Sequence, residues 1–408
     1  MEGSLFKRYD RQFWTLIGGS LINSFGYSLV YPFISLYLYL YRGISMTDVG
    51  LMLLVSALVG MLCQAVAGEL SDRIGRKTIL AVGLAVSTAG FGLLTMAILS
   101  GAGFMEFLAL MCLREGASGF YRSMPGIMIA DTVPAGDRNS AFSLLRIGWN
   151  LGFALGPMLG GVLATYSYGI LFGMATVTSG IYLLIALFLL QDTKPEKFPA
   201  AKSPGYGEVW RDHPFLLFCG IAALVTLVYA QIFSTFSTYS GSYGHISESE
   251  IGLLFSMNGF MIVAIQYPLA RFLERFRLTT SLIVGTLFYA VGYGAVGLCV
   301  GFWPLVGCMI LITMGEIVYS PSSMNIVSRM AKPETRGRYM SLADMMASAG
   351  FAFGPAVGGF LMDKYAGSIE TMWMMLGGLL IVCVFGLLVL RRMVSRQIDG
   401  PAGTLSDK

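Results

Sequence analysis

Long apolar runs follow one another along almost the whole chain, and they limit the fold more than any other feature of the sequence. A helix that crosses a bilayer needs about 20 mostly apolar residues. We find about twelve such runs, at residues 13–39, 49–67, 79–99, 104–130, 140–165, 168–190, 214–238, 250–270, 279–300, 303–327, 339–362 and 370–390. Only 12% of the 408 residues are charged, against about 25% in soluble domains. The sequence therefore predicts an all-α integral membrane protein without a separate soluble domain.

Lysine and arginine are distributed unevenly between the two sets of loops. If the N-terminus is cytoplasmic and the runs alternate in direction, 22 of the 27 basic residues fall on the cytoplasmic side and 2 on the other side. An excess of basic residues marks cytoplasmic loops. We therefore predict a multi-pass protein of the cell membrane with both termini cytoplasmic. The first run is expected to be an uncleaved anchor, because the residues before it lack the features of a removable signal.

One phrase occurs twice, as "NLGFALGPMLGG" at 150–161 and as "SAGFAFGPAVGG" at 348–359. A polar, proline-containing segment at 191–213 separates six runs from six, and the offset between the phrases is constant. The matching positions are Gly152, Gly156, Pro157 and Gly160, and Gly350, Gly354, Pro355 and Gly358. We predict two parallel six-helix halves, 1–190 and 214–392, joined by a cytoplasmic linker and followed by a tail at 393–408.

The spacing of the glycines in each phrase predicts close helix packing. Glycines four residues apart lie on one helix face, and small residues at this spacing let two backbones approach in lipid. Proline cannot donate to the carbonyl four residues earlier, so each helix should bend at its proline. A bent helix with a glycine face could seal against a partner and pivot on it. The alternative is that these glycines serve ordinary packing only.

The segment "GELSDRIGRKT" at 68–78 resembles the best-known loop motif of the major facilitator superfamily, and the duplicated phrase resembles that superfamily's antiporter motif. The loop positions that match are Gly68, Asp72, Arg73, Gly75, Arg76 and Lys77. The segments "IADTVPAGDR" and "GEIVYSPSS" resemble the drug:proton antiporter branch. Ser143 departs from the antiporter motif, which has a glycine there, and the second-half counterpart of the loop is degenerate.

This resemblance implies a major facilitator fold that alternates access by rocking one half against the other. It also implies that the 68–78 loop braces the outward-facing state. Asp131, at the cytoplasmic end of the fourth run, is expected to pair with Arg76. Arg146 and Asp344 occupy equivalent positions in the two halves with opposite charge, so they are candidates for a cytoplasmic gate, although separate local partners are an alternative.

Four charged residues lie well inside predicted spans: Arg114, Glu115 and Arg122 in the fourth run and Glu316 in the tenth. A centred charge costs roughly 2.5–3.5 kcal/mol, which makes such residues candidates for function. Adjacent helical residues do not face each other, so Arg114 and Glu115 should have separate partners, while Glu115 and Arg122 share a face. A buried carboxyl holds its proton more tightly, so Glu316 is a candidate for proton coupling or for binding a cation. A structural hydrogen bond is the alternative.

In the superfamily, the first, fourth, seventh and tenth spans line the central cavity. The resemblance therefore adds cavity candidates besides the charged residues: Asn23, Tyr31, Tyr229 and Phe233. Each aromatic residue could instead simply pack. Aromatic faces with few carboxylates suit lipophilic or cationic molecules. The sequence shows no nucleotide-binding loop, nucleophile–base arrangement or metal cluster, and each of the six cysteines stands alone in an apolar run. We therefore expect no enzyme, metal or cofactor.

These features predict a secondary active transporter that exports small lipophilic or cationic compounds in exchange for protons. The proton gradient is the expected energy source, the small-molecule substrate and the lipid bilayer are the expected partners, and the protein is expected to be a monomer without a nucleic-acid partner. Coupled transport of another solute, such as a sugar, an organic anion or a lipid-linked precursor, is the main alternative. A membrane sensor that transports nothing is a remote one.

Overall fold

The computed structural model describes residues 9–134, 137–193, 209–332 and 335–401. Within these ranges all regular secondary structure is helical, as the apolar runs predict. Most of the predicted linker, at 194–208, and the last seven residues of the predicted tail lie outside the described residues, as do residues 1–8. The predicted cytoplasmic position of both termini therefore stays a prediction.

Helices account for every predicted span. In chain order they are α2 (Arg11–Leu40), α3 (Met46–Ile74), α4 (Arg76–Ser100), α5 (Phe104–Tyr121), α6 (Met124–Thr132), α7 (Arg138–Tyr166), α8 (Tyr168–Leu189), η1 (Val209–Arg211), α9 (His213–Tyr229), η2 (Ala230–Phe233), α10 (Thr235–Ser242), α11 (Glu248–Leu273), α12 (Leu278–Val296), α13 (Phe302–Met330), α14 (Arg336–Lys364), α15 (Ile369–Met393) and α16 (Arg396–Asp399).

Eleven helices in the described ranges are long and apolar enough to cross a membrane. The predicted fourth span is not among them. It is divided into α5 and α6 at Arg122 and Ser123, and α5 contains three charged residues. Helix α5 has 18 residues and carries Glu106, Arg114 and Glu115, and α6 has only nine residues. The seventh span is also interrupted, by the short 3-10 helix η2. Both interruptions lie next to residues that the sequence singles out.

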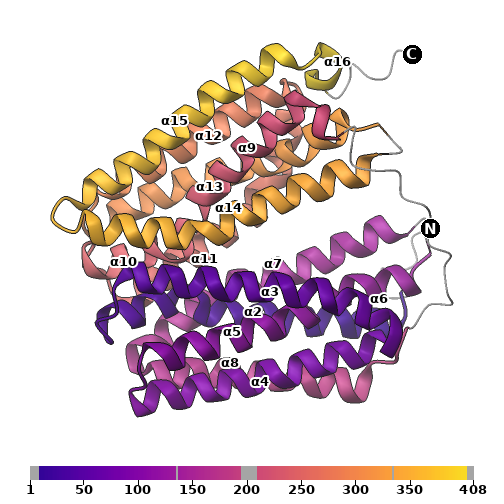
Figure 1. Ribbon diagram of the computed structural model, residues 1–408, viewed down its shortest axis with the longest axis vertical. Helices are drawn as coiled ribbons and strands as arrows, with labels where there is room; N and C mark the ends of the chain where they lie inside the picture. The colour runs from indigo at the N-terminus through magenta and orange to yellow at the C-terminus, as the bar shows by residue number, and fades with distance from the viewer. Residues whose placement is uncertain (1–8, 135–136, 194–208, 333–334, 402–408) are drawn as a thin grey trace. The chain divides into compact units, whose positions relative to one another are not determined.

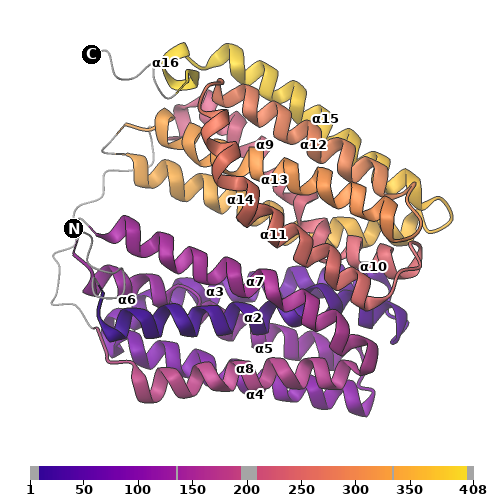
Figure 2. The same cartoon turned by 180° about the vertical axis from the view of Figure 1, so that it is seen from behind.

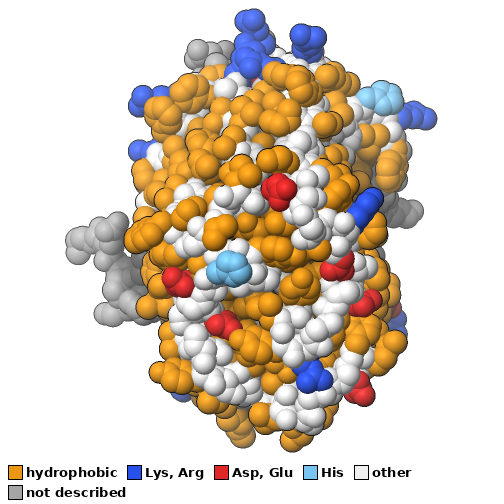
Figure 3. Space-filling model, turned by 90° about the vertical axis from the view of Figure 1, so that its left-hand side faces the viewer, with side chains coloured by type: hydrophobic (Ala, Val, Ile, Leu, Met, Phe, Trp, Pro, Cys, Tyr) orange, Lys and Arg blue, Asp and Glu red, His pale blue; other side chains and the backbone are white. Residues whose placement is uncertain are grey.

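Large apolar side chains remain exposed on the spans. Leu62, Phe188 and Val263 are 71%, 77% and 62% exposed, which would be unusual for several long helices of a soluble protein. Figure 3 shows the face where helices such as α4 and α8 end, and charged side chains are scattered among hydrophobic ones there. The exposed apolar side chains along the spans fit lipid as the solvent of the helices.

The chain forms two compact units. The first contains residues 1–44, 52–200 and 247–259, and the second contains 45–51, 201–246 and 260–408. Figure 1 and Figure 2 show α2, α4, α5 and α8 of the first unit side by side, and α12, α13 and α15 of the second likewise. The start of α3 thus clusters with the second unit, and the start of α11 with the first. The division of the chain at 191–213 into halves remains a prediction.

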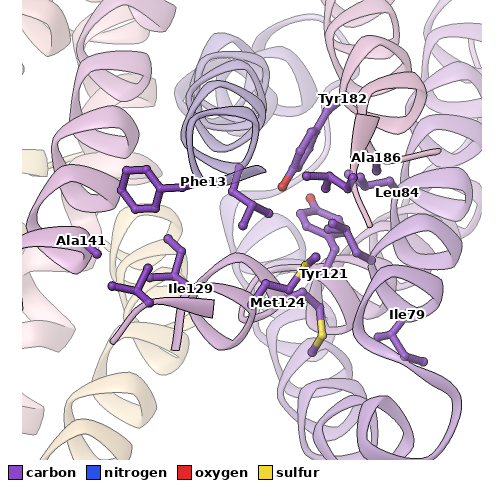
Figure 4. Close-up of a cluster of buried hydrophobic side chains, with 14 of the residues drawn as sticks. Phe13, Ile79, Leu84, Tyr121, Met124, Ile129, Ala141, Tyr182 and Ala186 are labelled. Carbon is purple, nitrogen blue, oxygen red and sulfur yellow. The ribbon is translucent and has the colours of Figure 1, made fainter. Parts of the chain in front are cut away.

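A buried apolar cluster fixes the short helix α6 in the first unit (Figure 4). Met124, Met128 and Ile129 of α6 are fully buried there. They pack with residues from α2, α4, α5, α7 and α8, among them Phe13, Ile79, Leu84, Tyr121, Ala141, Tyr182 and Ala186. The cluster therefore fixes α6 directly after the interruption at Arg122, the residue that follows the end of α5.

The first glycine phrase packs directly on helix α2. A Cβ atom at Gly152, Gly156 or Gly160 would lie within 3.0 Å of backbone atoms of α2. The α2 side chain of Ser24 donates a hydrogen bond to the Trp149 carbonyl oxygen at 2.7 Å. The predicted glycine face is confirmed, and it lies against the backbone of a neighbouring helix.

The second phrase repeats this arrangement against α9 and η2. A Cβ atom at Gly350 or Gly354 would lie within 3.0 Å of the Ala223 or Leu227 carbonyl oxygen. The Thr226 hydroxyl donates to the Ala347 carbonyl oxygen at 2.9 Å. Ala347 is the repeat equivalent of Trp149. In both copies, therefore, the carbonyl group at the same position accepts a hydrogen bond from a hydroxyl group of the partner helix.

The two prolines also have matching surroundings. A Cβ atom at Gly252 of α11 would lie within 3.0 Å of the Pro157 carbonyl oxygen, and one at Gly50 of α3 would meet the Pro355 oxygen in the same way. The carbonyl oxygen of the proline in each phrase thus contacts the first turns of a second helix, which is α11 for the first phrase and α3 for the second. The bend expected at each proline stays a prediction.

Candidate functional site

Glu316 lies in the middle of α13 in the second unit and is half-buried. Its Oε1 atom accepts a hydrogen bond from the Tyr229 hydroxyl at 3.0 Å, and the Tyr293 hydroxyl donates to the Tyr229 carbonyl oxygen at 3.1 Å. Tyr229 is the last residue of α9, directly before η2. The donor to the carboxyl group thus lies directly before the interruption of the seventh span.

Aromatic rings cluster around Tyr229, the residue that donates to this carboxyl group. The ring of Tyr229 lies 5.8 Å from that of Phe233 in an edge-to-face arrangement and 6.0 Å from that of Tyr289. Phe233 also lies 5.9 Å from the ring of Phe351. Ring faces attract cations, so the site combines one titratable carboxyl with surfaces that suit an organic cation. The structure places Tyr229, Phe233 and Glu316 together, as the resemblance implies.

A second cluster of charges lies in the first unit, on α5. The guanidinium of Arg114 pairs directly with the carboxylate of Glu115, and the second carboxylate oxygen of Glu115 lies 3.6 Å from Nη2 of Arg122. The expectation that Glu115 and Arg122 share a face is confirmed, and the structure adds an ion pair between them. The expectation that Arg114 and Glu115 have separate partners is wrong, because the long arginine side chain folds back to its neighbour instead of leaving a charge unpaired in an apolar span.

Arg114 is enclosed by aromatic rings. Its side chain is only 3% exposed, and its guanidinium carbon lies 5.3 Å from the ring centre of Tyr27 and 5.2 Å from that of Phe91. Tyr27 stacks on Tyr31 with 4.7 Å between ring centres. The Nη1 atom of Arg114 has no hydrogen-bond partner among the described residues. With two arginines and one glutamate, this cluster carries one positive charge in excess.

A small cavity adjoins this cluster. It has a volume of about 50 Å³, and Asn23, Tyr27, Arg122 and Trp149 contribute to its wall. The sequence candidates Asn23 and Tyr31 thus lie on the same side of α2 as the charged cluster of α5. The cavity by itself is too small for a drug-sized ligand.

The loop between α3 and α4 is built around Arg76. Its side chain is buried and pairs with Asp72 and, through Nε, with Asp131 at 3.3 Å. The expected pairing of Arg76 with Asp131 is confirmed, whereas the bracing role of the loop stays a prediction. Gly75 has a φ of +102° and a ψ of 149°, a conformation that is essentially restricted to glycine. Arg73 pairs with Glu69 on the exposed side.

Asp192 is a member of this site that the sequence did not indicate. Its Oδ1 atom accepts hydrogen bonds from the backbone N–H groups of Arg76 at 2.9 Å and Lys77 at 3.3 Å. A carboxylate in this position satisfies unpaired donors at the start of α4 and complements the helix dipole. The only indication of such a residue in the sequence was indirect, since Gly75 offers α4 no capping side chain.

Gly68 of the loop motif has open space where a Cβ atom would lie, so packing does not require glycine there.

Replacing Asp131 with asparagine should destabilise the protein, because the buried Arg76 guanidinium would lose part of its counter-charge. We expect a loss of about 2 kcal/mol, measured as a lower Tm in detergent. Glu69→Gln is the matched control, since it breaks an exposed pair worth about 0–1 kcal/mol. Equal melting of Asp131→Asn and wild type would show that the pair contributes nothing.

Two further carboxylates that the sequence did not indicate, those of Glu248 and Asp363, accept hydrogen bonds from groups at the ends of helices. Glu248 Oε1 accepts a hydrogen bond from the Tyr41 hydroxyl at 2.7 Å, which raises the pKa of Tyr41 to about 12. The proton of Tyr41 is therefore retained at physiological pH. In the second unit, Asp363 accepts hydrogen bonds from the backbone N–H groups of Met46 and Thr47 at the start of α3.

Arg146 and Asp344 are both exposed and belong to different units. Their pairing in a gate therefore stays a prediction. Among the residues that the structure describes, no group of three or more His, Cys, Asp or Glu side chains could hold a metal ion. The six cysteines are free thiols, although the sulfur atoms of Cys299 and Cys308 lie only 3.4 Å apart.

Comparisons with known proteins agree with this architecture. The sequence profile described as Major Facilitator Superfamily matches residues 16–245 and again residues 243–404. The multidrug resistance protein MdtH of Escherichia coli O9:H4 (strain HS) is 25% identical over 386 residues, which cover 93% of each chain. The uncharacterized MFS-type transporter YqjV of Bacillus subtilis (strain 168) is 25% identical over 359 residues, which cover 86% of each chain.

Solved structures share the fold. A peptide transporter POT in complex with sulfate superimposes with a TM-score of 0.80 at 18% identity, over 98% of this chain and 97% of that chain. The nucleoside transporter NupG superimposes with a TM-score of 0.76 at 14% identity, over 94% of this chain and 100% of that chain. At these identities the likeness concerns the arrangement of helices alone.

Proposed function

Because the chain belongs to the major facilitator superfamily, and is thus a multi-pass transporter of the cell membrane, we propose that it exports small lipophilic or cationic compounds in exchange for protons. The protein would expose its substrate site to each side of the membrane in turn. The proton gradient would supply the energy without any bound cofactor, and a monomer would suffice. The similarity to a multidrug resistance protein supports export as the direction.

The observation that carries this proposal is the carboxyl group of Glu316 among aromatic rings. The carboxyl is half-buried, accepts a hydrogen bond from Tyr229, and lies beside the ring system of Tyr229, Phe233 and Tyr289. In its ionised form it attracts a cation, and the rings add cation–π and apolar contacts. In its protonated form it loses that attraction. A proton and a cationic substrate thus compete for one group, which is the minimal requirement for exchange.

Competition at Glu316 predicts a sign for the effect of pH on binding. Over the pH range in which the Glu316 carboxyl takes up its proton, lowering the pH by one unit should weaken the binding of a lipophilic cation by up to about tenfold. The effect can be measured as the increase in Tm that ethidium or tetraphenylphosphonium causes at pH 8 and at pH 6. A larger increase at pH 6 than at pH 8 would contradict a shared carboxyl.

The α5 cluster supports a second candidate function, the transport of organic anions. Arg114 and Arg122 share the single carboxylate of Glu115, and Nη1 of Arg114 has no partner among the described side chains and backbone. An anionic group of a substrate would balance this excess charge. A thermal-shift screen with dyes, antibiotics, sugars and organic anions separates the two candidates. Stabilisation by anions that disappears in Arg114→Gln would favour the second.

A further inference from the structure

A cavity of about 440 Å³ lies within the second unit, between α9, α13 and α14. Its volume is in the range of sites that hold drug-sized ligands. Phe218, Ala222, Met324 and Val327 contribute apolar surface to its wall, and Glu316 is not part of that wall. The wall does include Tyr319, whose ring lies 6.3 Å from that of Tyr289, so the cavity adjoins the ring system near Glu316 without including its carboxyl group.

The wall of this cavity carries one carboxylate and no basic side chain. Asp344 is exposed at the wall, and no described residue forms a hydrogen bond or an ion pair with its carboxylate. Two of the neutral polar groups in the wall are already engaged. The Thr226 hydroxyl donates to the Ala347 carbonyl oxygen at 2.9 Å, and the Ser323 hydroxyl donates to the Ser320 carbonyl oxygen at 2.9 Å.

We propose that this cavity is a second binding site, which takes a lipophilic organic cation with Asp344 as its counter-ion. Apolar groups of the ligand would be buried against α9 and α13, away from water. The carboxylate selects for positive charge because the wall contains no cation to neutralise it. The inference rests on the proposed function for the class of ligand, but binding at this site is measured without transport.

Equilibrium binding of radiolabelled tetraphenylphosphonium tests the site in the purified full chain in detergent, with Glu316→Gln present in every sample to remove the carboxylate of the first site. Asp344→Asn keeps the shape of the side chain and removes its charge, so it should weaken the binding of this cation by about tenfold. Asp344→Glu should restore most of the affinity. The binding of triphenylphosphine oxide, a neutral analogue, should change less than twofold. Elution from a size-exclusion column confirms that each variant is folded.

A second measurement locates the ligand. Met324 is 50% exposed in the cavity wall, so a cysteine in Met324→Cys can be alkylated with a maleimide. Tetraphenylphosphonium should slow this alkylation in Met324→Cys, but not when Asp344→Asn is also present. Unchanged affinity in Asp344→Asn together with unprotected cysteine would overturn the site. If binding persists in a protein that shows no flux, the proposed function fails while the site stands.

Discussion

Replacing Glu316 with glutamine is expected to abolish the pH-driven component of transport. Glutamine keeps the oxygen atom that accepts the hydrogen bond from Tyr229, so the surrounding rings should stay in place. It cannot release or take up a proton, and it therefore cannot couple substrate movement to a pH gradient. In proteoliposomes, we expect the acceleration of substrate flux by a pH gradient to fall at least about tenfold, with exchange at equal pH retained.

Glu106→Gln is the control for this variant. Glu106 is exposed in the first turn of α5, so removing its charge should leave pH-driven flux unchanged. A Glu316→Gln protein that is folded and still responds fully to the pH gradient would refute the role of Glu316. A loss of equal size in Glu106→Gln would show that the assay reports a general charge effect.

Leucine at Gly156 is expected to prevent formation of the native fold. A Cβ atom there would lie within 3.0 Å of the Phe25 carbonyl oxygen and the Leu29 backbone nitrogen. These atoms belong to the backbone of α2, which cannot yield as a flexible side chain can. We expect a cost of about 3 kcal/mol or more, seen as loss of monodisperse protein after detergent extraction. Gly354→Leu should have the same effect through the Leu227 carbonyl oxygen.

Two other helical glycines provide matched controls. No atom lies within 4 Å of a Cβ atom built at Gly173 of α8 or at Gly378 of α15. Leucine at either position should therefore leave the yield and the Tm close to those of wild type. If Gly156→Leu and Gly354→Leu were as stable as these controls, the duplicated phrase would not mark close helix contacts.

The sequence predicted those parts of the structure that depend on spacing along one helix. The glycines of each phrase share a face and meet a neighbouring backbone, because a period of four residues fixes the face whatever the partner. The shared face of Glu115 and Arg122 follows from the helical period of 3.6 residues, since seven residues make about two turns. The partner helices α2 and α9 could not be derived from the phrase, since many helices can present a backbone to a glycine face.

Contacts that depend on long side chains or distant segments were not predictable in this way. Arg114 pairs with its own neighbour because its side chain can turn back along the helix, which a rule based on Cβ directions does not include. Asp192 reaches the start of α4 from beyond α8, and no pattern within the 68–78 loop indicates it. The interruption after Tyr121 was missed because apolar residues lie on both sides of it, although Pro125 and Gly126 follow it closely.

Proton movement by the wild-type protein tests the proposed exchange without any variant. Proteoliposomes enclosing a pH-sensitive dye, without an imposed pH gradient, are given an outwardly directed gradient of a lipophilic cation that stabilises the protein. We expect the departing substrate to drive protons inward, so that the interior becomes acidic, and we expect Glu316→Gln to remove this signal. Substrate movement without any change of internal pH in the wild-type protein would contradict the proposed exchange.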